Sequence, residues 1–318
     1  MELIKPGYTI WGETPCQPSE AIKWIEQAGR TCYKSEDRIT EDSAKQFTPA
    51  MFKRGHLSVT EHSNFVIRTI NKGKFPFGFM QQIFAILGRR NAYHRVVVHD
   101  DHIYMNGNLR AWKETLDAVR ASNLAMTKEW ENLFYCYYQD VIPGLELQDW
   151  VGGVFETVTG PNEVPLDLKM ITVKFICDRG VSHELVRHRP AAFSQESTRY
   201  VDYNGKEMQF IIPPWVDIKP DIYNSFDVPF LLMKGCSHSW VKDCAALESE
   251  YRYLREGGWK PEQARSILPN SLKTEVVMTA DIPEWKHVFK LRARLAAHPQ
   301  MQELMIPLKA DFERVGWL

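Results

Sequence analysis

Apolar and polar residues follow two different periods along this chain, which predicts a mixture of helices and strands. Apolar side chains recur at helical spacing over residues 20–30, 43–55, 109–140, 181–188, 226–256, 261–268, 283–297 and 300–314. β-branched or alternating apolar runs predict strands over residues 63–70, 168–177 and 274–279. Because these segments are interspersed without a regular βαβ order, the pattern predicts an α+β fold, a mixed sheet with packed helices.

The strand predicted over residues 168–177 leads to the segment with the most side chains suited to ligand binding. It is bounded by Asp178-Arg179-Gly180, continues into a short helix and ends in a loop of basic and hydroxyl residues. A buried strand that feeds such a loop is a normal way to hold a site on a rigid scaffold. No Gly-x-Gly-x-x-Gly follows a strand, so we expect a non-Rossmann fold.

The composition is that of a soluble globular protein. Of the 318 residues, 44% are hydrophobic and 25% are charged, and the formal net charge is −1. No global basic field recruits nucleic acid or an anionic membrane, so any site for a polyanion must be local. No apolar run approaches the ~18 residues of a transmembrane helix, and the first residues lack the layout of a signal peptide, so a cytoplasmic location is expected.

The cysteines and histidines outside the basic loop do not predict a metal site. The six cysteines have neither a disulfide framework nor Cys-x-x-Cys spacing, and we expect reduced, mostly apolar thiols. His99-Asp-Asp-His102 has two potential ligands but no further partner nearby in the sequence, so it is interpreted as a polar surface loop.

The loop over residues 187–200 reads Arg-His-Arg-Pro-Ala-Ala-Phe-Ser-Gln-Glu-Ser-Thr-Arg-Tyr. We call this segment the signature. An arginine fork binds phosphates and carboxylates through two parallel hydrogen bonds, and hydroxyl groups follow at Ser197 and Thr198. This combination indicates a pocket for a phosphorylated, ring-bearing ligand. The alternative is a solvated basic loop, since charge runs usually face water.

The complete pattern resembles the signature of the flavin-dependent thymidylate synthases (the ThyX family). Those enzymes methylate dUMP with a folate methylene donor and a reduced flavin. Four further segments resemble the family in the expected order, and they lie at residues 28–35, 55–62, 264–269 and 291–300. The resemblance implies a single catalytic domain over residues 1–318 and a homotetramer with sites at subunit interfaces. An unusually long separation between His62 and Arg187 implies an insertion, predicted as mainly helical, at about residues 72–165.

The resemblance also implies roles for individual residues. Arg292 is the catalytic candidate. Flavin binding is implied for Ser58, Glu61, Arg187, His188, Arg189, Gln195, Asp281 and His287. Binding of dUMP is implied for Glu184, Arg187, Gln195, Glu196, Ser197, Thr198, Arg199, Arg265 and Arg292, with Arg265 contributed by a neighbouring subunit. The expected cofactors are FAD and NADPH, and methylenetetrahydrofolate is the co-substrate.

The signature departs from the family pattern at several positions. Gln195 stands where the family often has a glutamate, and an amide can hydrogen-bond but cannot act as a base. Glu184 stands where glutamine is common, and Asp281 and His287 stand where asparagines are common. No cysteine is credibly placed to attack the uracil ring, so activation is expected to be electrostatic, through Arg292.

Two other functions fit parts of the same pattern. One is a flavin-dependent enzyme of the same fold that hydroxymethylates a pyrimidine nucleotide. The other is a non-enzymatic nucleic-acid-binding protein that uses the Arg-His-Arg cluster. The near-neutral net charge and the lack of a basic stripe interleaved with aromatic residues argue against the second.

Overall fold

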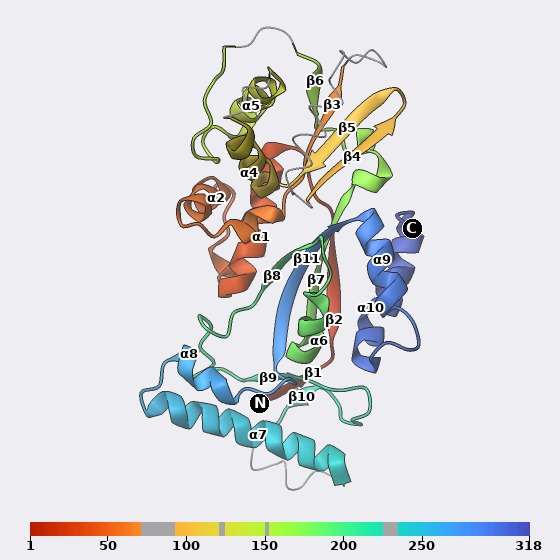
Figure 1. Cartoon of the computed structure of the whole chain (residues 1–318). Helices are drawn as coiled ribbons and strands as arrows, with labels where there is room; N and C mark the ends of the chain where they lie inside the picture. Colours follow the sequence, from red (N-terminus) through yellow and green to blue (C-terminus); the bar gives the residue numbers. More distant parts are fainter. Residues whose placement is uncertain (71–92, 121–124, 150–152, 225–234) are drawn as a thin grey trace.

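The computed structural model describes residues 1–70, 93–120, 125–149, 153–224 and 235–318. Three sheets follow one another along the long axis of the molecule, and helices pack against each of them (Figure 1). The helices are α1 Pro18–Tyr33, α2 Ala44–Lys53, α4 Leu109–Arg120, α5 Ala125–Tyr138, α6 Arg179–Leu185, α7 Gly235–Glu256, α8 Pro261–Ala264, α9 Ile282–Arg292 and α10 Pro299–Val315. The α+β class predicted from the sequence is confirmed.

The central sheet carries the signature. Its strands are β2 Gly7–Glu13, β7 Met170–Asp178, β11 Lys273–Asp281 and β8 Ala192–Gln195, in the order β2-β7-β11-β8 with antiparallel neighbours throughout. Helices α9 and α10 cover one face of this sheet (Figure 1), where the aromatic rings of Trp285, Phe289 and Phe312 pack against one another and Trp285 contacts Phe175. These rings are almost fully buried, so α9 is fixed against the sheet by the packing of its apolar face.

Two aspartates each end a strand of the central sheet and cap the helix that follows it. Asp178 ends β7 and its side chain accepts a hydrogen bond from the backbone N of Val181, at 2.6 Å. Asp281 ends β11 and accepts from the backbone N of Glu284 in the same way, at 2.8 Å. Such N-caps satisfy backbone donors that a helix start leaves free. As a result, α6 leads into the signature, while α9 starts at the opposite end of the antiparallel pair.

A second sheet lies beyond the central one, with the order β4-β5-β3-β6. Its strands are β3 Phe65–Thr69, β4 His94–His99, β5 His102–Gly107 and β6 Phe155–Val158. Helices α4 and α5 pack on it through fully buried aromatic residues such as Trp112 and Phe134. Asp100 and Asp101 form the β4–β5 turn with positive φ angles of 48° and 62°, a conformation that matches the twist of a tight hairpin.

A third, small sheet closes the other end of the molecule. It has the order β10-β1-β9, with β1 Glu2–Ile4, β9 Gln209–Ile211 and β10 Asp221–Ile222. Helix α7 packs beneath it, and the short helix α8 continues into a 3-10 turn, η6 Arg265–Ile267 (Figure 1). The 3-10 turns η1 Glu36–Arg38, η2 Leu57–Glu61, η3 Pro161–Glu163 and η4 Leu166–Leu168 complete the described elements.

The structure also differs from the pattern-based prediction. The stretch 109–140 is two helices, α4 and α5, and the helix predicted over 283–297 ends at Arg292. The described part of 72–165 contains three strands besides those helices, and the sequence analysis missed them; the Arg89-Arg90-Asn91 cluster within it lies outside the described residues. Within the described residues, no helix has the length and apolar character needed to cross a bilayer.

Candidate active site

Arg292, the last residue of α9, joins that helix to the signature. Its Nε donates to Nε2 of His188 at 3.0 Å. Its Nη1 donates to a carboxylate oxygen of Glu184 at 2.5 Å, and Nη2 donates to the backbone carbonyl of the same residue at 3.3 Å. Because α9 runs back over the face of the central sheet, a residue more than a hundred positions away in the sequence reaches the turn after α6.

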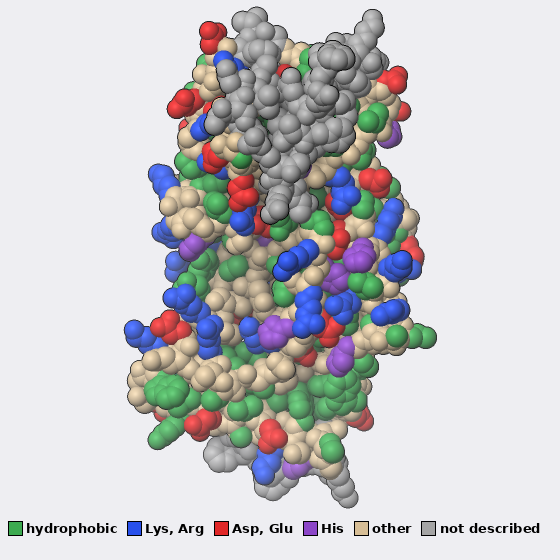
Figure 2. Space-filling view, viewed as in Figure 1, with side chains coloured by type: hydrophobic (Ala, Val, Ile, Leu, Met, Phe, Trp, Pro, Cys, Tyr) green, Lys and Arg blue, Asp and Glu red, His purple; other side chains and the backbone are tan. Residues whose placement is uncertain are grey.

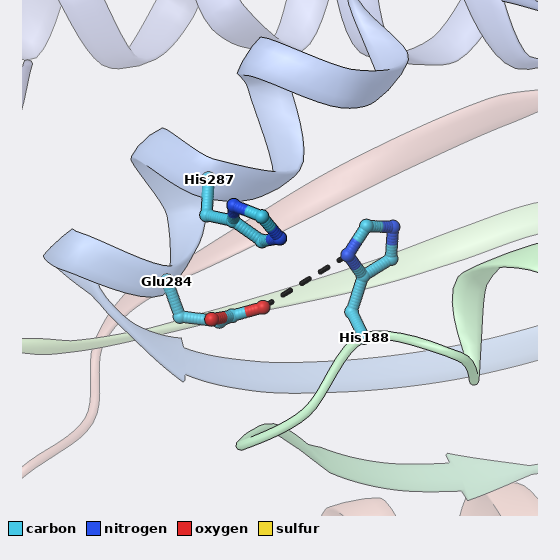
Figure 3. Close-up of side chains that lie close together, drawn as sticks. All are labelled: His188, Glu284 and His287. Carbon is cyan, nitrogen blue, oxygen red and sulfur yellow. Dashed lines mark ion pairs between the residues drawn. The ribbon is translucent and has the colours of Figure 1, made fainter.

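His188 is the centre of this arrangement. Its side chain is 4% exposed, and burial, followed by the charge of Arg292 and the presence of His287, lowers its pKa to about 4. The imidazole is therefore neutral near pH 7. Since Nε2 accepts from Arg292, the ring proton must lie on Nδ1, which faces a carboxylate oxygen of Glu284 at 3.9 Å (Figure 3).

Glu284 is a site residue that the sequence analysis missed. Burial, reinforced by the nearby carboxylate of Asp281, raises its pKa to about 7. Its Oε1 is buried and has no hydrogen-bond partner among the described residues. The available signal was its place on α9, three residues before His287, because such a pair shares one helix face. This spacing indicates a site only once α9 is known to pack against the signature.

His188, Glu284 and His287 could also hold a divalent cation. One ligand atom from each lies within 4.8 Å of the others, and two imidazoles with a carboxylate are suitable donors (Figure 3). However, ligation through Nδ1 of His188 would move the ring proton to Nε2, where it would meet the N–H of Arg292. The observed hydrogen bond therefore favours a proton rather than a metal ion between His188 and Glu284.

Arg187 and Arg189 flank His188 and extend from the surface. Both are exposed, and within the described ranges neither guanidinium forms an ion pair. Lysine, arginine and histidine side chains gather across the middle of this face of the molecule (Figure 2). The local basic site expected from the sequence is thus present on a chain whose net charge is near zero.

The following residues of the signature are bonded within the fold. The Gln195 amide donates to Ser182 Oγ at 2.9 Å and to Thr274 Oγ1 at 3.2 Å. Glu196 is buried, accepts from Nζ of Lys273 at 3.0 Å and accepts from the Tyr203 hydroxyl at 3.3 Å. Ligand contacts by Gln195 and Glu196 stay predictions, and they would have to compete with these bonds.

The last part of the signature returns to the surface. Thr198 is buried, whereas Arg199 is exposed and its Nε lies 3.5 Å from a carboxylate oxygen of Glu262 on α8. The hydroxyl of Ser197 accepts from the backbone N of Arg199 at 3.3 Å. Arg265 is exposed on η6, directly after α8, so this exposed arginine lies on the element beside the end of the signature.

Other predicted flavin ligands have partners from the region of the predicted insertion. Glu61 is buried at the end of η2 and accepts from Arg110 of α4 at 2.5 Å, while burial raises its pKa. Asp281 caps α9 and accepts from Arg95 of β4 at 2.5 Å, and burial raises its pKa as well. Ser58 is exposed on η2. Arg95 and Arg110 were not predicted as site residues, and only the folded arrangement of β4 and α4 reveals them.

The exposed arginines beside a buried histidine give this α+β protein a site whose chemistry suits anionic ligands. The sequence profile of the family "Thymidylate synthase complementing protein" matches residues 156–315, which is half of the chain. The chain therefore belongs to the thymidylate synthase complementing protein family, the ThyX family.

Individual relatives carry the name "Flavin-dependent thymidylate synthase". The protein of Thermococcus onnurineus is 34% identical over 119 residues, 37% of this chain and 43% of the relative. That of Pyrococcus horikoshii is 32% identical over 172 residues, 49% and 65% of the two chains. That of Geobacter sulfurreducens is 31% identical over 130 residues, 41% and 50% of the two chains. The matched regions thus span about half the length of these curated relatives.

Proposed function

We propose that this protein is a flavin-dependent thymidylate synthase, which methylates dUMP to dTMP with methylenetetrahydrofolate as carbon donor and NADPH-reduced FAD. One observation carries the proposal: three hydrogen bonds hold the guanidinium of Arg292 against His188 of the signature and Glu184 of the preceding helix α6. A fixed cation beside a basic, ring-binding loop suits a reaction in which negative charge develops on a uracil ring.

The residues around His188 fit an anionic, ring-containing cofactor. Arg187 and Arg189 offer exposed guanidinium groups, Ser58 and His287 offer exposed polar side chains, and Glu284 holds a buried oxygen without a partner. When bound, the flavin would supply the reducing equivalents for the transfer. Glu61, Gln195 and Asp281 remain part of the proposed cofactor site, although each already has a partner in the chain.

The nucleotide would be held by the surface part of the signature. Arg199, the Ser197 hydroxyl and neighbouring backbone N–H groups suit the phosphate, and Arg265 would add a second guanidinium from the neighbouring subunit. A bound phosphate would displace Glu262 from Arg199, a weak exposed pair. Contacts by Arg187, Glu196 and Thr198 with the nucleotide belong to the same proposal.

Arg292 would stabilise negative charge on the N3–C4 carbonyl system of the uracil, so that C5 becomes nucleophilic. Glu184 holds this guanidinium in the absence of substrate, and the nucleotide would compete with that carboxylate.

Cys32, whose carbonyl accepts from Ser197 N, is a poor candidate for covalent attack. Burial raises the pKa of its thiol, and the thiol donates to the carbonyl of Ala28. A thiol that stays protonated does not suit nucleophilic catalysis, which leaves charge stabilisation by Arg292 as the mode of activation.

The proposal includes a cytoplasmic homotetramer and a single non-Rossmann domain of ThyX-like fold with an insertion at about residues 72–165. Light scattering of the purified chain would measure the oligomeric state. A monomer that is fully active would remove the interfacial role of Arg265.

The test of the function uses the purified full-length chain. We expect yellow protein with flavin absorbance that converts dUMP, methylenetetrahydrofolate and NADPH into a product with the mass of dTMP. A product with the mass of hydroxymethyl-dUMP would show instead that the protein hydroxymethylates the nucleotide, which is the alternative function. Colourless protein that cannot be reconstituted with FAD and forms no product would overturn both.

A further inference from the structure

A cleft lies between α9 and α10, two helices that lie side by side (Figure 1). Its volume is about 390 Å³, and no residue of the signature lines it. Four basic side chains line the cleft together with one carboxylate, and these are Lys286, Lys290, Arg294, Lys309 and Glu313. A space of this size accommodates a ligand of nucleotide size.

Three of these cations have no acidic partner. Lys286, Lys290 and Arg294 are exposed, and none of them forms an ion pair with a residue that the structure describes. Lys309 is paired with Glu313 at 3.0 Å. Even when the main-chain carboxylate of the last residue is counted, positive charge is in excess in the cleft.

The spacing of the cations is unfavourable for α9 itself. Lys286 and Lys290 are four residues apart on one helix face, and Arg294 follows four residues later, just past the end of the helix. Like charges at this spacing destabilise a helix. A cation near the C-terminus would gain from the helix dipole, but Lys286 lies in the first half of α9.

Ordinary solvated helix faces in this chain are built differently. On α1, for example, the exposed Lys23 has a carboxylate one turn away, Glu20, at 2.7 Å. No acidic residue lies three or four positions from Lys286, Lys290 or Arg294. The unpaired cations of α9 therefore suit an anion that is not part of the described chain.

The cleft also offers apolar surface to a ligand. Ala293 and Leu318 line it, and both are partly exposed. The nearby Phe289 is buried and stacks on Trp285 with ring centroids 5.6 Å apart, so packing in the core holds α9 in place. Accessible apolar groups beside unpaired cations suit a molecule that joins an anionic group to a ring.

The same helix connects the cleft with the group around His188. The ring of His287 belongs to that group, and its centroid lies 6.2 Å from that of His188 (Figure 3). Lys286 directly precedes His287, and Lys290 follows three residues later, so Lys290 and His287 are neighbours on the helix surface. A long ligand can therefore extend from the cleft along α9 to His287.

The proposed reaction requires a ligand of this kind. Arg187 and Arg189 are assigned to FAD, and Arg199 and Arg265 to the phosphate of dUMP, whereas no residue has been assigned to NADPH. One end of NADPH is an adenosine that carries a 2′-phosphate, and the other end is the nicotinamide ring that gives up the hydride. An anionic group and a ring thus occur together at the end that does not react.

We infer that the cleft between α9 and α10 binds a phosphorylated ring compound and that, on the proposed function, this compound is the adenosine 2′-phosphate end of NADPH. Lys286, Lys290 and Arg294 would hold the phosphate. Ala293 and Leu318 would pack against the adenine. The nicotinamide end would extend past the neighbouring histidine of α9 toward the flavin.

A binding experiment tests the two parts of this ligand separately. The full chain is saturated with FAD and dUMP, so that the sites proposed for them are occupied, and is titrated in a calorimeter with adenosine 2′-phosphate, adenosine or inorganic phosphate. We expect saturable binding of adenosine 2′-phosphate and at least about tenfold weaker binding of the other two, because each lacks one set of contacts. Equal binding of inorganic phosphate would indicate an adventitious ion only. That result, equal binding of adenosine, or no saturable binding would overturn the proposal.

A charge reversal in the cleft gives the second comparison. Lys290→Glu should weaken binding of adenosine 2′-phosphate at least about tenfold and raise the KM for NADPH by a similar factor. The KM for NADH, which lacks the 2′-phosphate, should change by less than about twofold. The same substitution at Lys242, which is exposed on α7, should change none of these values. Unchanged binding of adenosine 2′-phosphate to Lys290→Glu contradicts the assignment.

The cleft and the proposed function can fail separately. If the protein forms dTMP and Lys290→Glu has an unchanged KM for NADPH, the assignment of the cleft is wrong and the proposed function stands. If no dTMP forms but adenosine 2′-phosphate still binds in a manner that depends on Lys290, the proposed function is wrong and the cleft remains a site for a phosphorylated ring compound.

Discussion

The two halves of the signature differ in how far their side chains already have partners in the fold. In the first half, Arg187 and Arg189 are exposed and form no ion pair in the described part of the chain. In the second half, Gln195 and Glu196 are hydrogen-bonded to Ser182, Thr274, Lys273 and Tyr203. The same motif therefore contains side chains that are free to bind and side chains that hold the backbone in place.

This difference indicates a division of labour. Ligand groups gain most from side chains that lose nothing on binding, and they are positioned best when the supporting backbone is rigid. Glu196 and Lys273 belong to a buried ionic cluster with Glu275, which also accepts from Lys34 and forms an ion pair with Lys174. Although burial alone would raise the pKa of Glu275, these lysines hold it at about 2, so this carboxylate is charged near neutral pH. Loss of a side chain that is bonded within the fold should cost stability, and loss of an exposed side chain without a partner should cost binding.

The largest effect is expected from Lys273→Met. Lys273 is 9% exposed and neutralises both Glu196 and Glu275, so its loss leaves two buried carboxylates without their main partner. We expect the free energy of unfolding to fall by about 3–5 kcal/mol, measured by urea denaturation. The exposed Lys290→Met serves as the control and should change it by less than about 0.5 kcal/mol. Equal stabilities of the two variants would contradict a structural role for the second half.

Arg292→Ala should have the next largest effect, and its main effect should be on activity. Removing a preorganised cation from a developing negative charge is expected to lower kcat by about 10²- to 10³-fold. FAD absorbance should be retained, because the proposed flavin contacts of Arg187 and Arg189 remain. Arg38→Ala, at an exposed arginine outside the proposed sites, is the control and should stay near wild-type turnover. Turnover of Arg292→Ala within about threefold of that control would remove Arg292 from catalysis.

The pair of His188 and Glu284 predicts a dependence of stability on pH. The pKa of Glu284 is raised to about 7, so its stabilising contribution is complete below its unfolded value of 4.5 and is lost as the pH rises through 7. The pKa of His188 is lowered to about 4, so its contribution is complete above its unfolded value of 6.5 and is lost as the pH falls through 4. The two trends oppose each other over this range.

Glu284→Gln isolates the carboxylate. Relative to wild type, this variant should become more stable as the pH rises from 5 to 8, by up to about 3 kcal/mol. Glu250→Gln, an exposed carboxylate on α7, should show no such trend. Parallel urea-unfolding curves for the wild type and Glu284→Gln at both pH values would exclude a buried proton on Glu284.

Much of the fold was predictable from the sequence because long elements show their period. The strand of β7 and the helices α1, α2 and α10 were predicted within a few residues. Short strands such as β8 and β9 were missed, since three or four residues carry no readable period. The β4–β5 hairpin has a local signal in the sequence, the dipeptide Asp100-Asp101, which was interpreted only as part of a polar surface loop. In the structure these two residues form the hairpin turn with positive φ angles.

The site was predictable as a set of residues but not as a set of contacts. Arg292 and His188 were named from the sequence, and the structure brings them to 3.0 Å. That Glu196 faces Lys273 and not the surface depends on the pairing of β8 with β11, which joins segments about eighty residues apart. Glu284 and Arg95 gain their roles only through tertiary packing, which a motif does not encode.

The smallest effect that separates the two halves is expected from Arg187→Ala and Gln195→Ala. Arg187→Ala should weaken FAD binding about tenfold and leave the free energy of unfolding within about 0.5 kcal/mol, because the side chain is exposed. Gln195→Ala should instead lower that free energy by about 1–2 kcal/mol, since it leaves Ser182 and Thr274 without a donor. Flavin titration and urea denaturation of both variants, with the exposed Arg38→Ala as control, measure the contrast. If Gln195→Ala lost FAD affinity at unchanged stability, the second half would also contact the cofactor directly, and the division between the halves would fail.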